Sequence, residues 1–136
     1  MSFESINDDY CRARGAATNV ELIIMKRNHY INATKLCAHA GKRISKWVQY
    51  NHDLIEEYTN NLETEAKIVI TTGPREFHGT YFHPEIIPHI ALWISPQHLI
   101  AVNNIINEYN IFKEQQEYAH LPWYEKMLIK FYVMFQ

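Results

Sequence analysis

The chain has 136 residues, of which 47% are hydrophobic and 21% are charged, and its formal net charge is -2. This length suits one domain with a hydrophobic core, and the composition excludes disordered, collagen-like and membrane-channel proteins. The acidic start (residues 1–9) does not resemble a signal peptide, and no stretch has the ~18 apolar residues of a membrane span. We therefore expect an intracellular protein with no membrane partner.

The charges nearly cancel in total but are unevenly distributed along the chain. Residues 22–52 contain six bases and no acid, whereas residues 53–65 contain five acids and no base. A nucleic acid responds to the local electrostatic field rather than to the net charge. The six bases are Lys26, Arg27, Lys35, Lys42, Arg43 and Lys46.

The first elements are a lead-in and a hairpin. Residues 1–18 are polar and mixed in charge, which predicts a flexible N-terminal lead-in. Residues 20–27 are rich in β-branched and apolar side chains, and a turn at residues 28–29 precedes a second apolar stretch. This pattern predicts an N-terminal β-hairpin. We place one domain at residues 19–110.

Two helices are predicted next. Asn32 can cap a short helix over residues 33–40, which ends at Gly41. Apolar residues then recur at spacings of three, four and seven, which describes one face of a second helix. These residues are Ile44, Trp47, Val48, Leu54, Ile55 and Tyr58. Two helices joined around one glycine form a helix-turn-helix candidate.

A second hairpin and further helices complete the chain. Residues 67–72 and 80–82 read as strands on either side of a glycine-bounded loop with a basic and aromatic tip. Pro84 suits the start of a short helix that contains Pro88, and Ser95 followed by a proline opens a longer helix.

The C-terminal residues 111–136 are expected to form a helical extension packed on the same domain. The last helix, from residue 122 onward, carries large apolar side chains at Trp123, Met127, Phe131 and Met134. It either packs across the other helices or provides the surface of a homodimer.

The outward face of the second helix carries the side chains that contact nucleic acids. Residues facing away from the apolar side are Arg43, Lys46, Gln49, Tyr50 and Asp53. Bases crowd the start of this helix, while Glu56 and Glu57 lie near its end. That order opposes the helix dipole, and an anion bound at the start would relieve the cost. The alternative is a charged face that contacts only solvent.

The tip of the second hairpin adds Arg75 and His78, with Phe77 between them. This tip is interpreted as a wing that touches the DNA backbone or minor groove, and the alternative is a merely exposed loop. The predicted DNA-contacting residues are Lys35, Lys42, Arg43, Lys46, Gln49, Tyr50, Arg75 and His78.

Four blocks resemble the KilA-N family of DNA-binding modules from large DNA viruses and phages. They are residues 30–37 (YINATKLC), 41–47 (GKRISKW), 79–85 (GTYFHPE) and 91–96 (ALWISP), and the likeness covers roughly residues 20–110. The resemblance implies a compact α+β fold related to fungal APSES domains, with an N-terminal β-hairpin, a helix-turn-helix, a β-hairpin wing and C-terminal helices. It also implies that residues 32–34 mark the junction between hairpin and helix.

The resemblance further implies double-stranded DNA as the partner, bound mainly through phosphates with little or modest sequence specificity. A poxvirus-like member is expected in the viral factories of the host cytoplasm, with the nucleus as an alternative. Poxvirus members often carry a C-terminal RING finger that makes them ubiquitin ligases. No array of Cys and His pairs follows here, so we do not expect ligase activity.

An enzyme and a protein-interaction module are the two alternative functional classes. The motifs HExxH, GxSxG, GxxxxGK[ST] and GxGxxG do not occur, and two cysteines, Cys11 and Cys37, provide neither a zinc site nor a disulfide framework. We therefore expect no enzymatic activity, no cofactor and no metal. The stronger rival is a protein-interaction module that uses the same fold to engage a host or viral partner. Single-stranded DNA and RNA remain open as ligands.

Overall fold

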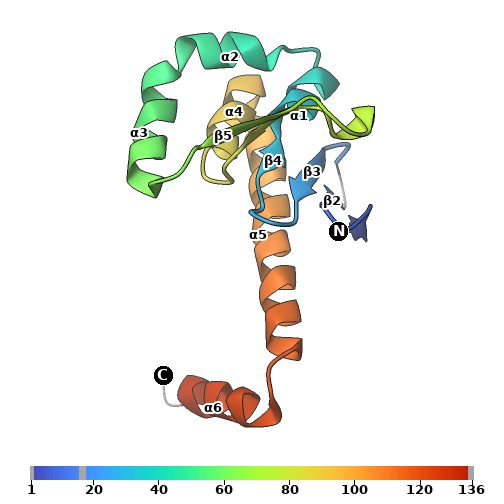
Figure 1. Ribbon diagram of the computed structural model, residues 1–136, viewed down its shortest axis with the longest axis vertical. Coiled ribbons are helices and arrows are strands. Elements are labelled where there is room, and N and C mark those ends of the chain that lie inside the picture. The colour runs from blue at the N-terminus through green and yellow to red at the C-terminus, as the bar shows by residue number, and fades with distance from the viewer. Residues whose placement is uncertain (1, 16–17, 135–136) are drawn as a thin grey trace.

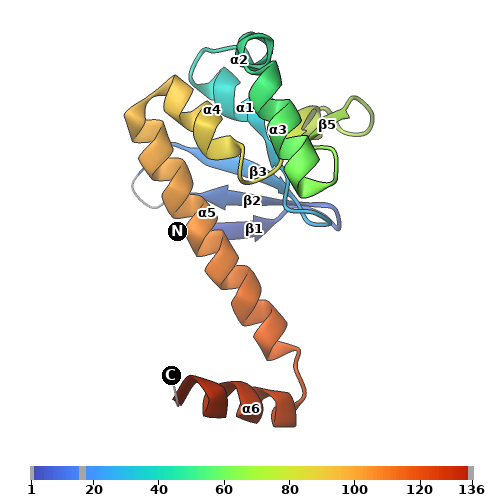
Figure 2. The ribbon, with the colours of Figure 1, turned by 90° about the vertical axis from the view of Figure 1, so that its left-hand side faces the viewer.

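The computed structural model describes residues 2–15 and 18–134. Within these ranges the chain forms an α+β domain in which helices cover one face of an antiparallel sheet (Figures 1 and 2). The sheet has six strands in the order β1-β2-β3-β4-β6-β5. The strands are β1 (Ser2–Ser5), β2 (Tyr10–Arg14), β3 (Glu21–Met25), β4 (Ile31–Asn32), β5 (Lys67–Ile70) and β6 (Gly79–Phe82).

The expected flexible lead-in over residues 1–18 is wrong for the residues that the structure describes, and residues 1, 16 and 17 lie outside them. Strands β1 and β2 form an antiparallel hairpin that extends the sheet from β3. In β2, Cys11 and Ala13 are buried while the two arginines between and after them face outward. This alternation with a period of two is what a half-buried strand requires, but its inward side chains are small and two of its three outward side chains are charged.

The predicted hairpin over residues 20–31 is confirmed as β3 and β4, with Ile24 opposite Ile31. Leu22 and Ile24 of β3 face the helices, whereas Ile23 and Met25 face the opposite side of the sheet. Because both faces are covered, the strand reads as a continuous apolar run.

The first helix, α1 (Ala33–His39), agrees with the prediction at both ends. The Asn32 side chain accepts a hydrogen bond from the Lys35 amide at 2.9 Å, and Gly41 follows the helix with a φ of +74°. A positive φ favours glycine, which explains why the helix stops there.

The second predicted helix is in fact two, α2 (Ile44–Tyr50) and α3 (His52–Leu62). The helical path breaks at Asn51, with φ -129° and ψ 28°, and the side-chain amide of Asn51 donates to the Trp47 carbonyl at 2.7 Å. The apolar face nevertheless points inward as predicted, since Leu54, Ile55 and Tyr58 pack against the core. The break changes the direction of the helix without changing the side that it buries.

The predicted β5–β6 hairpin is confirmed, but its loop is not a free tip. The loop contains a short 3-10 turn, η1 (Arg75–Phe77), and Phe77 is buried. The Tyr10 and Phe77 rings stack at 4.1 Å between centroids, which holds the loop against the back of the sheet.

The next two helices pack against each other and complete the main core. Helix α4 (Ile87–Ile94) begins three residues after Pro84, and Pro88 lies in its first turn, where a missing N–H costs nothing. Helix α5 (Pro96–Ala119) is capped as predicted, because Ser95 Oγ accepts a hydrogen bond from the His98 amide at 3.0 Å. The expected domain boundary at residue 110 therefore falls inside a continuous helix.

The C-terminal helix α6 (Trp123–Met134) does not pack on the domain, contrary to the expectation for residues 111–136. It turns across the far end of α5, away from the sheet and the other helices (Figures 1 and 2). Trp123 is 72% exposed and Leu128 is 66% exposed. The side chains of Phe131 and Met134 lie outside the described residues. No helix in the described ranges has the length and apolar character needed to cross a membrane.

Candidate nucleic-acid interface

A network of polar contacts joins the start of α1 to strand β6. The buried Asn32 donates through Nδ2 to the His78 carbonyl at 3.2 Å, and the Thr34 hydroxyl accepts from the Thr80 amide at 2.8 Å. Gly79 lies between them with a φ of +141°, and a Cβ there would come within 2.8 Å of Asn32 Oδ1 and Thr34 Cβ. These contacts fix the helix-turn-helix relative to the hairpin, because each residue serves both elements.

The eight predicted contact residues lie on three neighbouring parts of the fold. Helix α1 contributes Lys35, and the turn and helix α2 contribute residues 42, 43, 46, 49 and 50. The β5–β6 loop contributes Arg75 and His78. Figure 1 shows α1 between α2 and this loop. The six exposed members of the set are Lys35, Arg43, Lys46, Gln49, Tyr50 and Arg75.

The other two members already have partners within the domain. The Lys42 amino group donates to the Trp93 carbonyl at 3.3 Å and lies 4.4 Å from the centroid of the Trp93 ring. The His78 Nε2 lies 2.8 Å from the Gly73 carbonyl oxygen, so the imidazole helps to close the β5–β6 loop. Lys42 thus ties the turn to the C-terminal end of α4, where a cation is favourable.

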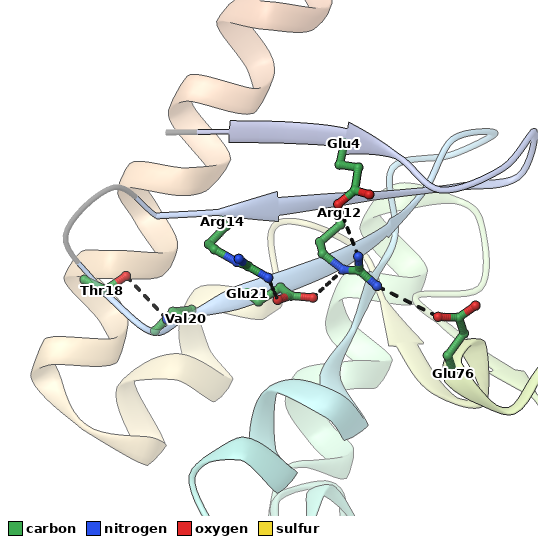
Figure 3. Close-up of polar contacts among 7 residues, drawn as sticks. All are labelled: Glu4, Arg12, Arg14, Thr18, Val20, Glu21 and Glu76. Atoms are coloured by element: carbon green, nitrogen blue, oxygen red, sulfur yellow. Dashed lines mark hydrogen bonds and ion pairs between the residues drawn. The ribbon is translucent and has the colours of Figure 1, made fainter.

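The exposed bases of α1, α2 and the turn between them differ from the arginines of β2. Within the described ranges, every ion pair involves Arg12 or Arg14, which contact Glu4, Glu21 and Glu76 (Figure 3). Lys35, Arg43 and Lys46 form no ion pair with any described acid. Their charges are therefore available to an external anion, whereas those of Arg12 and Arg14 are already paired.

The break at Asn51 corrects the argument from the helix dipole. Helix α2 has seven residues, and Glu56 and Glu57 belong to α3 rather than to the end of the basic helix. Asp53 lies in the first turn of α3, where an acid is favourable. The reversed charge order along one helix does not exist, so the basic surface consists of exposed side chains and not of a helix terminus.

The β1–β2 hairpin supports the β5–β6 loop, a role that the sequence pattern did not predict. Besides the stacking of Tyr10 on Phe77, one guanidinium nitrogen of Arg12 lies 3.8 Å from a carboxylate oxygen of Glu76 (Figure 3). The Tyr81 hydroxyl donates to the Phe77 carbonyl at 2.8 Å, and burial raises the pKa of this phenol. The sequence signal for β2 is the alternation of inward and outward residues over positions 10–14. The arginines among the outward residues make this stretch look like an exposed polar segment.

The two cysteines lie outside this surface. Both cysteines are buried. Burial raises the pKa of the Cys37 thiol to about 11, and it also raises the pKa of the Cys11 thiol. A thiol with a raised pKa is a poor nucleophile at neutral pH. Among the described residues, no group of three or more His, Cys, Asp or Glu side chains is placed to hold a metal ion.

The family model for the KilA-N domain matches residues 16–112. The chain belongs to the KilA-N domain family. The matched region contains the helix-turn-helix, the β5–β6 hairpin and the Asn32–Gly79 contacts that join them. The family is one of DNA-binding domains, and membership agrees with the resemblance seen in the four sequence blocks.

The similar proteins come from several large DNA viruses. A KilA-N domain-containing protein of Acanthamoeba polyphaga mimivirus is 37% identical over 84% of this chain and 35% of its own length. An uncharacterized protein of fowlpox virus (strain NVSL) is 34% identical over 87% of this chain and 83% of its own length. A KilA-N domain-containing protein of Invertebrate iridescent virus 6 is 33% identical over 71% of this chain and 30% of its own length.

This KilA-N chain spans only about a quarter to a third of two mimivirus relatives, which match over 35% and 24% of their lengths. Those relatives are therefore much longer than the domain described here. No solved structure matches the chain significantly.

Proposed function

We propose that this chain is a viral, non-catalytic KilA-N protein that binds double-stranded DNA mainly through phosphates, with little or modest sequence specificity. The contacts come from α1, α2 and the β5–β6 loop. One observation carries the proposal: Lys35, Arg43 and Lys46 are exposed on a helix-turn-helix of this family and form no ion pair with the described acids. Unpaired cations supply the electrostatic part of DNA binding.

The side chains around these bases favour positioning on the DNA backbone over reading of a defined sequence. Gln49 and the 76% exposed Tyr50 can reach base edges or phosphates from α2. Arg75 provides one additional cation from the β5–β6 loop. Lys42 and His78, which contact Trp93 and Gly73, are assigned mainly to holding the surface in place.

The test is a fluorescence anisotropy titration of the protein with labelled duplex DNA, single-stranded DNA and RNA at two salt concentrations. Contacts to four to six phosphates predict a slope of log affinity against log salt of about -4 to -5 for duplex DNA. Changing Arg43→Glu and Lys46→Glu together should weaken duplex binding by at least about 100-fold, because two attractive charges become repulsive. Lys42 is left unchanged because its contact with Trp93 supports the fold.

The matched control is the double variant Lys67→Glu with Lys113→Glu, which makes the same change in net charge on β5 and α5. It should keep most of the affinity of the unchanged protein. Both variants should melt normally, since the altered residues lie outside the core. Equal losses in the two double variants would contradict a localised interface, and unchanged affinity for Arg43→Glu with Lys46→Glu would refute the assignment.

A second candidate function is a protein-interaction module that engages a host or viral partner. The observation that favours it is the exposed apolar surface of α6, which includes Trp123 and Leu128. This module would show little salt-dependent affinity for DNA, so the same titration separates the two functions. In either case we propose an intracellular site of action, in viral factories of the host cytoplasm or in the nucleus. A homodimer through the C-terminal segment is compatible with both.

A further inference from the structure

The inner corner between α5 and α6 is an apolar groove that no part of the described chain fills. It has a volume of about 600 Å³ and a floor formed by Ile111, Tyr118, Leu121 and Ile129. Figures 1 and 2 show α6 turning across the end of α5, so the two helices form an L whose inner side faces away from the sheet. A contiguous apolar surface of this kind marks an interaction site.

The amount of exposed apolar surface is sufficient for a stable interface. Apart from Phe112, which stacks on Phe3, the exposed large side chains of this region are Ile111, Trp123, Tyr124, Met127, Leu128 and Ile129. If each contributes on the order of 100 Å², one copy offers on the order of 600 Å². Standard-size interfaces bury about 600 to 1,000 Å² on each partner.

The charges around the groove favour a second copy of the same helix as its occupant. Glu114 and Glu117 line the groove and form no ion pair with the described residues. Helix α6 carries Lys126 and Lys130 one turn apart, beside the exposed Met127, and the Lys126 amino group lies at the edge of the groove, 5.6 Å from the centroid of the Tyr118 ring. An apolar helix with two lysines therefore complements an apolar groove with two glutamates, and both surfaces belong to this chain.

We propose that two copies clasp each other through these helices, with α6 of each copy lying in the groove between α5 and α6 of the other. The exchange is symmetric, so a two-fold axis closes the assembly and leaves neither groove open. Lys126 and Lys130 of one copy face Glu114 and Glu117 of its partner. This dimer does not depend on DNA binding, because the basic residues of α1 and α2 lie at the opposite end of α5 (Figure 2).

The test uses the full chain without DNA, with mass measured by analytical ultracentrifugation over a dilution series from about 100 µM. The unchanged protein should be a dimer that dissociates on dilution. Leu128→Glu should raise the dimer Kd by on the order of 100-fold, because it places a charge in an apolar interface. The matched control Glu56→Lys, on the exposed face of α3, should leave the Kd unchanged.

Two charge-reversed variants identify the groove as the docking site. One carries Glu114→Lys with Glu117→Lys, and the other carries Lys126→Glu with Lys130→Glu. Each alone should be monomeric because like charges face each other, but an equimolar mixture should form a heterodimer in which every facing pair is again opposite. A monomeric unchanged protein at about 100 µM, dimers of either charge-reversed variant alone, or a mixture that stays monomeric would each overturn the proposal.

Discussion

Gly79 shows how one residue positions the candidate interface. Its φ of +141° is unfavourable for any other residue, and its missing side chain leaves room for Asn32 and Thr34 to contact the strand. Asn32 is buried, and both ends of its amide are bonded, one to α1 and the other to the β5–β6 loop. A change at Gly79 therefore affects the helix cap, the strand and the loop together.

We expect Gly79→Ala to lower the free energy of unfolding by about 2 to 4 kcal/mol, because it adds backbone strain to a close contact. The matched control is Gly41→Ala. Gly41 also has a positive φ, but a Cβ there meets nothing within 4 Å, so the loss should be about 1 kcal/mol. Urea denaturation of the two variants measures the difference. Equal losses at the two sites would show that the contacts with Asn32 and Thr34 contribute nothing.

At the scale of elements, β3, β6 and the β5–β6 loop form a second, smaller core on the back of the sheet, and the β1–β2 hairpin packs against it through Ile6 and Tyr10. Ile23, Met25, Tyr30, Phe77 and Tyr81 are its buried members. Arg12 lies beside this core and contacts acids from β1, β3 and the loop. The loop is therefore held by packing and by charge, although its sequence reads as an exposed tip.

We expect Phe77→Ala to cost about 3 to 5 kcal/mol of stability, as the loss of a buried aromatic ring usually does. Hydrogen exchange of residues 71–78 should rise more than exchange in α1 or α4, because the loop loses its anchor while the main core keeps its contacts. Val69→Ala is the control, since Val69 is 57% exposed on the adjacent strand. An even rise in exchange over the whole domain would argue that Phe77 does not anchor the loop specifically.

Local signals in the sequence account for the elements that were predicted well. The cap at Asn32, the glycine after α1, the cap at Ser95 and the apolar run of β3 each act through neighbouring residues, so they are visible without tertiary structure. The break at Asn51 has no proline or glycine to mark it. Helix α3 turns there because its apolar face packs on the core, which is a long-range effect.

The candidate site could be predicted only in part, because some of its residues are held by contacts with residues far away along the chain. The basic, acid-free segment around Arg43 and Lys46 is a property of the sequence, and the structure leaves these side chains exposed. The partners of Lys42 and Phe77 lie 51 and 67 positions away along the chain, at Trp93 and Tyr10. No local pattern reveals such contacts.

At the scale of the whole molecule, the fold of the domain does not depend on α6 for its stability. The main core ends along α5 at Tyr109, and α6 contributes no buried residue among those described. We expect removal of residues 121–136 to leave the melting temperature of the monomer within about 2 °C of the full chain, because little apolar area is lost from the fold. Calorimetry at low protein concentration measures this. A drop of about 10 °C would show that the helix stabilises the domain directly.

The length of α5 sets a spacing that matters for any assembly built on this chain. Beyond Tyr109 the helix continues to Ala119 with mostly exposed residues, a distance of about 15 Å at 1.5 Å per residue. A helix of this kind acts as a rigid strut. Whatever is attached at α6 is held clear of the helix-turn-helix, so we expect the proposed DNA duplex and the proposed second copy to bind the chain at the same time.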